Sequence, residues 1–131
     1  MVAEVLYTVP QLSQELKITQ RAIRFYESKG LIKPRRAGNT RIFTYKDRAR
    51  LVIIIRAKKL GFSLNDIKTY LDLYDFDPDH TKQSESALES ISQRIHHLKD
   101  QEKEIKTIIK ELKSLEDDIR KSLNKNNARV R

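Results

Sequence analysis

The sequence predicts a mainly α-helical protein, in which a small winged helix-turn-helix domain precedes a long helix of coiled-coil type. Three features indicate this fold class. Short segments with helical spacing of apolar residues follow one another through residues 8–74. A Gly-Asn pair at Gly38 interrupts them within a segment of strand character. From Leu88 onward, apolar residues recur with the heptad spacing of a coiled coil.

The first two predicted helices are short and close together in the sequence. Thr8 and Pro10 suit a helix start, because proline in the first turn lacks only an N–H that has no partner there. Thr19 can cap the second helix through its hydroxyl, and Gly30 can end it in the left-handed conformation. Two short helices joined only by residues 17–18 form a helix-turn-helix arrangement.

The second of these helices has two chemically different faces. Ala22, Ile23 and Tyr26 fall on one side, at the spacing of an apolar face. Guanidinium and amide groups can hydrogen bond the base edges and phosphates of DNA. We therefore expect the opposite face to read DNA, with the long donor side chains Gln20, Arg21 and Arg24.

Residues 31–45 are expected to form a β-hairpin, or wing. Gly38 and Asn39 are a turn signal, and Ile42 with Phe43 suits a short strand. An ordinary solvated loop is the alternative, but the segment holds four cations and no acid, which favours a wing. These cations are Lys33, Arg35, Arg36 and Arg41.

Two further helices are predicted after the wing. Residues 47–60 have helical spacing, and Gly61 ends them. Ser63, with an acid three residues later, indicates the next helix start. The apolar faces are predicted to be Leu51, Ile54 and Ile55 in the first helix and Ile67, Tyr70, Leu71 and Tyr74 in the second.

Residues 75–80, which read DFDPDH, break the helical pattern with a proline and three acids. We therefore place a DNA-binding domain at residues 1–76 and a coiled-coil dimerisation helix at residues 77–131.

A heptad repeat dominates the second half of the chain. Eleven positions between Leu88 and Leu123 alternate in steps of three and four, and nine of them are apolar. A helix over that span is roughly 54 Å long, and it cannot bury such a stripe alone. We expect a homodimer, with packing against the first domain as the alternative. The predicted dimer contacts are Leu88, Ile91, Ile95, Leu98, Ile105, Ile109, Leu112, Ile119 and Leu123.

Glu102 and Glu116 occupy two of the heptad core positions and bear on the orientation of the pair. In a parallel dimer each glutamate faces its own copy, whereas in an antiparallel dimer both can face isoleucines. Cations at the e positions would oppose one another in the antiparallel form, which counts against it. Because the glutamates lie four residues before Lys106 and Arg120, they offset part of that repulsion. The balance modestly favours an antiparallel pair.

The excess positive charge is confined to the first half of the chain. Of a net charge of +9, residues 1–74 hold 15 Lys and Arg against 6 Asp and Glu, while the remainder holds 12 of each. This segregation is typical of a polyanion-binding module joined to a neutral element. The chain has no cysteine and no long apolar run, so we expect a cytoplasmic protein without disulfides or thiolate metal sites.

The sequence offers no catalytic or metal-binding constellation. It has no nucleophile–base pair, and its three glycines form no phosphate-binding loop. His96 and His97 are adjacent, so on a helix they point about 100° apart and are poorly placed to share an ion. We expect no enzymatic activity, no cofactor and no metal.

Three motifs of the chain are AIRFYESKGLI (Ala22–Ile32), Arg41 with an aromatic residue two positions on, and LGFSLNDI (Leu60–Ile67). Together they resemble the MerR family of bacterial transcription regulators. The order of elements is also similar, over about residues 6–124. The resemblance implies a dimer on a palindrome between two promoter elements that are spaced too far apart for RNA polymerase. It also implies that the protein bends and underwinds the DNA.

A narrower resemblance is carried by Thr40–Leu64 and by the run DLYD (Asp72–Asp75). These segments look like regulators of leucine/isovalerate and acyclic-terpene degradation. The resemblance implies control of branched-chain amino acid or acyl-CoA catabolism.

The family resemblance also implies individual DNA contacts. The second helix would face the major groove with Gln20, Arg21 and Arg24, while Tyr26, Arg41 and Lys58 would hold phosphates. A core position for Tyr26 and a solvated helix face for Lys58 are the alternatives. Thr40 and Phe43 depart from the family, which commonly has tyrosines there. The full predicted DNA-binding set is Gln20, Arg21, Arg24, Tyr26, Arg35, Arg36, Arg41 and Lys58.

The expected partners are double-stranded DNA, a second copy of the chain, RNA polymerase at the promoter and a small-molecule effector that the sequence does not identify. An architectural protein that bends DNA without regulating single promoters is the alternative function. A coiled-coil adaptor with an incidental basic patch is a third.

Overall fold

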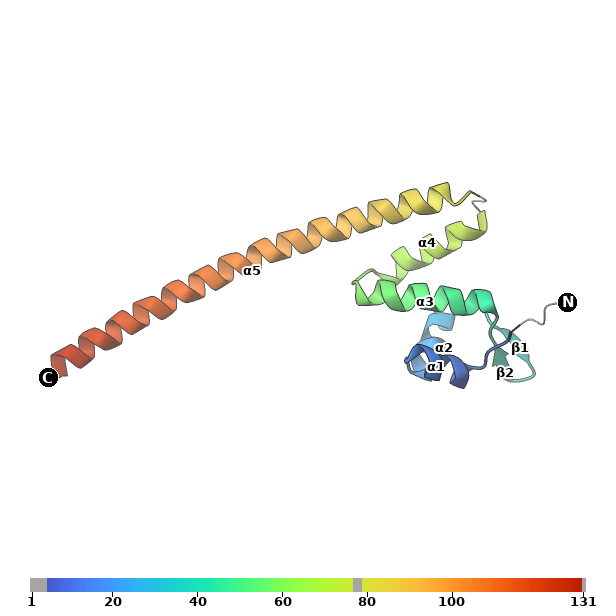
Figure 1. The fold of residues 1–131 in the computed structure, drawn as a ribbon, viewed down its shortest axis with the longest axis horizontal. Coiled ribbons are helices and arrows are strands. Elements are labelled where there is room, and N and C mark those ends of the chain that lie inside the picture. The colour runs from blue at the N-terminus through green and yellow to red at the C-terminus, as the bar shows by residue number, and fades with distance from the viewer. Residues whose placement is uncertain (1–4, 77–78, 131) are drawn as a thin grey trace. The chain divides into compact units, whose positions relative to one another are not determined.

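The computed structural model describes residues 5–76 and 79–130 (Figure 1). Within that part of the chain it has five α-helices and a two-stranded antiparallel sheet, so the predicted fold class is confirmed. The chain divides into two compact units, Met1–Ser90 and Ile91–Arg131. The elements in order are α1 (Val9–Leu16), α2 (Gln20–Ser28), β1 (Arg35–Ala37), β2 (Thr40–Ile42), α3 (Tyr45–Lys59), α4 (Leu64–Phe76) and α5 (Thr81–Val130).

Capping hydroxyls fix the helix starts at the positions that the sequence indicates. Thr8 accepts a hydrogen bond from the backbone N–H three residues later at 3.3 Å, and Thr19 does the same at 3.0 Å. Ser63 caps α4 through a bond from the backbone N–H of Asp66 at 3.1 Å. Each hydroxyl satisfies a backbone donor that the first helical turn leaves without a partner.

Helix α3 begins two residues earlier than its apolar spacing predicted, because Thr44 and Asp47 form a capping box. The Thr44 backbone N–H donates to the Asp47 carboxylate at 2.9 Å, and the Asp47 N–H donates to the Thr44 hydroxyl at 3.3 Å. The first bond gives the buried Asp47 carboxylate a donor, and the second pairs its backbone N–H. Only Phe43 separates Thr44 from Ile42, the last residue of β2, so the box joins the wing directly to α3.

One hydrophobic core lies beneath α1 to α4 and the wing. Phe43 is fully buried, and its backbone exchanges two hydrogen bonds with Tyr7, at 2.9 and 2.8 Å. The segment before α1 is thereby fixed beside the end of the wing. The core side chains are Val9, Leu12, Ile23, Leu31, Ile32, Phe43, Leu51, Ile54, Ile67 and Leu71.

The predicted apolar faces of α3 and α4 are largely confirmed. Leu51 and Ile54 are buried, and Ile55 is half-buried. In α4, Ile67 and Leu71 are buried and Tyr70 is half-buried, whereas the side chain of Tyr74 lies outside the described residues.

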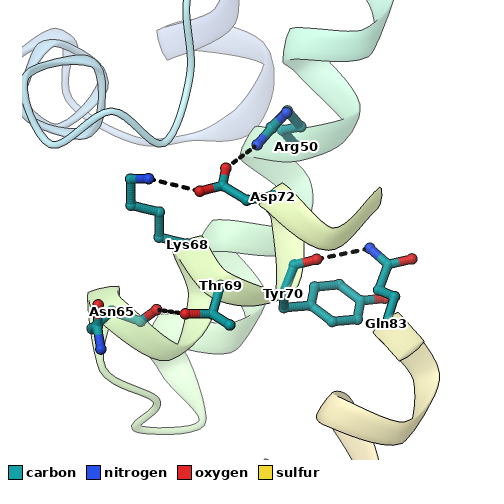
Figure 2. A network of polar contacts seen from close by, with 7 residues as sticks. All are labelled: Arg50, Asn65, Lys68, Thr69, Tyr70, Asp72 and Gln83. Atoms are coloured by element: carbon teal, nitrogen blue, oxygen red, sulfur yellow. Dashed lines mark hydrogen bonds and ion pairs between the residues drawn. The ribbon is translucent and has the colours of Figure 1, made fainter. Parts of the chain in front are cut away.

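Helices α3 and α4 lie side by side, and a polar network joins them (Figures 1 and 2). The Asp72 carboxylate of α4 accepts from Arg50 of α3 at 3.3 Å and from Lys68 at 2.6 Å. At the start of α5, the Gln83 amide donates to the backbone carbonyl of Tyr70 at 3.0 Å. Polar contacts that periodicity alone does not predict therefore connect the middle of α4 to α3 and to the start of α5.

Helix α5 is continuous over 50 residues, and the predicted break before it narrows to the few residues between Phe76 and Thr81. Of this break, residues 77–78 lie outside the described chain. The nine apolar heptad side chains are 44% to 68% exposed, and Ile108 and Leu115 beside them are 54% and 57% exposed. The heptad stripe is therefore an uncovered apolar surface of this chain. Among the described helices, none combines the length and apolarity needed to cross a membrane.

Candidate nucleic-acid interface

Helix α2 is anchored through one face and leaves the other free. Ile23 is fully buried in the core, and Ala22 is half-buried beside it. Gln20, Arg21 and Arg24 are all exposed. The predicted division of α2 into a core face and a donor face is confirmed, although contact with DNA stays a prediction.

Tyr26 and Phe25 take different environments on α2. Tyr26 is half-buried and packs against the core, so the alternative of a core position for this residue is partly confirmed. Phe25 is 44% exposed, and the Lys29 ammonium lies 5.6 Å from its ring centroid. Sequence periodicity does not single out Phe25, because an exposed aromatic side chain leaves no pattern in the spacing.

The wing forms as predicted, and the alternative of an irregular loop is wrong. Strands β1 and β2 pair antiparallel across the Gly38-Asn39 turn, where Gly38 has a φ of 62°. In this register Arg36 stands directly opposite Arg41. Residues directly opposite in an antiparallel pair point to the same face of the sheet.

Glu27 of α2 is the acid that meets these two arginines. Its carboxylate accepts from Arg41 Nε at 2.5 Å, and an Arg36 guanidinium nitrogen lies 3.5 Å from its other oxygen. The side chains of Glu27 and Arg41 are only 20% and 26% exposed. Sequence reasoning missed Glu27. A signal was available, because a two-residue turn at Gly38-Asn39 sets Arg36 opposite Arg41, and two adjacent cations favour a nearby acid.

The remaining predicted DNA contacts, Arg35 and Lys58, are separate exposed cations. Arg35 lies on β1 and Lys58 lies near the end of α3. Lys33, the other cation of the predicted wing, precedes β1 and is also exposed. Of the predicted site residues, the structure thus brings Arg36 and Arg41 together around Glu27, and no hydrogen bond or ion pair links the others to this cluster among the described residues.

The histidines form no metal cluster in the part of the chain that the structure describes. His96 lies 3.6 Å from Asp100, one helical turn along α5. Across residues 5–76 and 79–130, no group of three or more His, Cys, Asp or Glu side chains is placed to hold a metal ion.

Comparison with protein families identifies the family to which this fold belongs. A family model for "MerR HTH family regulatory protein" matches residues 7–73, and another for "MerR, DNA binding" matches residues 48–115. The chain belongs to the MerR family. It is therefore a MerR-type DNA-binding transcriptional regulator.

Two curated HTH-type transcriptional regulators align with most of the chain. The transcriptional regulator ZntR of Escherichia coli strain K12 is 29% identical over 111 residues, covering 79% of this chain and 78% of ZntR. The HTH-type transcriptional regulator slr0701 of Synechocystis is 30% identical over 121 residues, covering 91% of this chain and 81% of the relative.

Two solved MerR-family structures are similar to this one. PbrR691 of Ralstonia metallidurans CH34, solved with lead(II), is 25% identical with a TM-score of 0.68 and 82% of each chain covered. HiNmlR, described as a MerR family regulator lacking the sensor domain and bound to promoter DNA, is 27% identical with a TM-score of 0.58. That likeness covers 73% of this chain and 77% of HiNmlR. These relatives do not support the narrower resemblance to regulators of leucine, isovalerate and terpene degradation.

Proposed function

We propose that this MerR-type regulator binds as a homodimer to a palindromic operator within a promoter and distorts the DNA there. The observation that carries the proposal is the exposed donor face of α2 beside a cationic wing, in the half of the chain that holds the whole excess of positive charge. The promoter-DNA complex of the relative HiNmlR supports the same use of this fold.

The exposed side chains suggest a division of work at the DNA. Gln20, Arg21 and Arg24 lie on a helix that the core holds rigidly, which suits hydrogen bonding to base edges. Arg35 and Lys58 are exposed cations outside that helix, which suits phosphate contact. Tyr26 packs against the core but is only partly buried, which is compatible with the phosphate contact that the family resemblance implies.

The second copy of the chain is the proposed occupant of the α5 stripe. Nine apolar side chains in heptad register are exposed along one helix, and such a pattern is buried by a like pattern. Glu102 and Glu116 each form an i,i+4 ion pair, with Lys106 at 3.0 Å and with Arg120 at 3.7 Å. These pairs lessen the repulsion between e-position cations, in keeping with a modest preference for the antiparallel form.

RNA polymerase is the proposed partner at the promoter, where the bound dimer would realign two widely spaced promoter elements. For the regulated genes we propose acyl-CoA or branched-chain amino acid catabolism. This pathway rests only on the resemblance carried by Thr40–Leu64 and Asp72–Asp75.

Capture of genomic DNA fragments by the purified full chain, followed by sequencing, tests the proposal. A regulator should prefer its sites by roughly 10³-fold or more over random DNA. The expected result is a few palindromes inside widely spaced promoters. Broad capture without sequence preference would instead favour an architectural DNA-bending protein, and capture independent of salt would contradict DNA binding through these cations.

A further inference from the structure

We propose that Glu27 is a positioning residue that fixes the wing against the reading helix α2 through its ion pair with Arg41. We call this Glu27–Arg41 ion pair the lock. In this role Arg41 holds the wing in place and does not contact a phosphate. The specificity part of this proposal rests on the operator binding proposed above. The role of Arg41 can be tested on DNA of any sequence.

The register of the wing favours an acid at this place. Arg36 and Arg41 are direct cross-strand partners in a hairpin whose strands are three residues long, so their side chains leave the same face of the hairpin. Like charges directly opposite each other destabilise a strand pair. A carboxylate between them converts this repulsion into two attractive contacts.

Glu27 supplies that carboxylate from a different element. It lies one helical turn after Ile23, the residue that anchors α2 in the core. One carboxylate oxygen accepts from Arg41 Nε at 2.5 Å, and the other lies 3.5 Å from Arg36. Because Glu27 and Arg41 are both mostly shielded from water, this charge-assisted bond is stronger than an exposed ion pair.

The lock joins the two surfaces that are proposed to meet the DNA. The reading face of α2 and the wing are connected along the chain by residues 29–34, which lie outside helices and strands. A wing that moved relative to α2 would have to be ordered at the moment of binding, and that ordering costs affinity. With Glu27 in place, the helix and the wing arrive already in register.

Arg41 and Arg35 differ in what they can offer a phosphate. The Nε of Arg41 is bonded to Glu27, whose charge offsets that of the guanidinium. Arg35 is exposed, and within residues 5–76 and 79–130 no ion pair involves it. The phosphate contact of the wing is therefore assigned to Arg35.

The test compares four variants of the full chain with the parent: Glu27→Gln, Arg41→Gln, the double variant, and Arg35→Gln as the matched control. Binding is measured by fluorescence anisotropy over a series of salt concentrations, on the strongest fragment from the genomic capture and on a scrambled duplex of equal length. Thermal unfolding of each variant verifies that it is folded.

The lock predicts different results for the two arginines. The slope of log affinity against log salt is negative, and Arg35→Gln should make it shallower by roughly 0.9, the value for one phosphate contact. Arg41→Gln and Glu27→Gln should leave this slope unchanged, yet weaken operator binding on the order of tenfold, as expected for loss of one charge-assisted hydrogen bond. The double variant should bind about as well as either single variant, since each single change already removes the same charge pair.

Opposite results would overturn the proposal. If Glu27 only competed with DNA for the arginines, Glu27→Gln would bind the scrambled duplex more tightly and with a steeper salt slope. A shallower salt slope for Arg41→Gln would make Arg41 a phosphate contact. Additive losses of affinity in the double variant would show that Arg41 and Glu27 act independently. If the genomic capture yields no operator, the operator proposal fails, while the slopes on the scrambled duplex still decide the role of Arg41.

Discussion

Arg24 is a long donor side chain on the exposed face of a helix that Ile23 holds in the core. A side chain of this kind can discriminate between bases only if its backbone is fixed, because a guanidinium must align with acceptors on the base edge. The capping bond of Thr19 at the helix start and the burial of Ile23 provide this fixing.

We expect Arg24→Ala to weaken operator binding by about 1–3 kcal/mol and to relax the preference at one base position. The measurement is competition between the operator and single-base variants of it. Lys110→Ala on α5 is the matched control, because it removes the same charge from an exposed helix position outside the reading face. Equal losses on operator and random DNA would show that Arg24 contacts only the backbone.

At the scale of single residues, local signals were readable and cross-chain contacts were not. Thr8, Thr19 and Ser63 act on backbone groups three residues away, so their capping roles follow from the sequence. Glu27 and Arg41 are 14 residues apart, and their contact depends on how the wing packs against α2. No periodicity carries that information.

The capping box of Thr44 and Asp47 is the best example of control at the scale of an element. It holds the first turn of α3 immediately after the wing, and its bonds are partly shielded from water. The apolar spacing of α3 placed its start two residues too late, because the first turn is defined by polar contacts rather than by burial.

Thr44→Ala should lower the free energy of unfolding by about 1 kcal/mol, the usual cost of losing a threonine cap. Chemical denaturation of the variant and the parent measures the difference. Thr69→Ala is the control: its hydroxyl donates to the Asn65 carbonyl at 3.0 Å within α4 (Figure 2), so its loss should cost little in a helix that favours alanine. Equal destabilisation by both changes would argue against a special role for the cap.

The turn of the wing gives a second prediction at this scale. Gly38 has a φ of 62°, and nothing lies within 4 Å of the position that a Cβ would take. Gly38→Ala should therefore destabilise by roughly 1–2 kcal/mol through backbone conformation alone. Gly38→Asn should cost less, because asparagine tolerates this region. The order of the two denaturation midpoints checks the assignment, and a reversed order would contradict it.

At the scale of the whole molecule, charge and apolar surface occupy different parts of the chain. The excess of cations falls in residues 1–74, while the uncovered stripe runs along α5. Both features were predictable, because net charge and heptad spacing are properties of long segments. The orientation of the pair was not, because heptad spacing fits parallel and antiparallel partners alike and only Glu102 and Glu116 distinguish them.

Replacing Ile105 and Ile109 together by lysine should convert the proposed dimer into a monomer, because two charges would enter the apolar stripe. Light scattering at matched concentrations measures the mass. Replacing Thr107 and Ser114 together by lysine adds the same charge on a different face of α5 and should leave the dimer intact. A mass that is unchanged in the first variant would refute the heptad assignment.

The reading face on α2 and the stripe on α5 share no residue, and this separation has a genetic consequence. A subunit that lacks Arg24 but keeps α5 would still pair with intact subunits, and each mixed pair would carry a single working helix. In a cell that makes both forms, such a defect should be dominant in a reporter assay. A subunit whose stripe is broken would leave its intact counterparts to pair with each other, so that defect should be recessive.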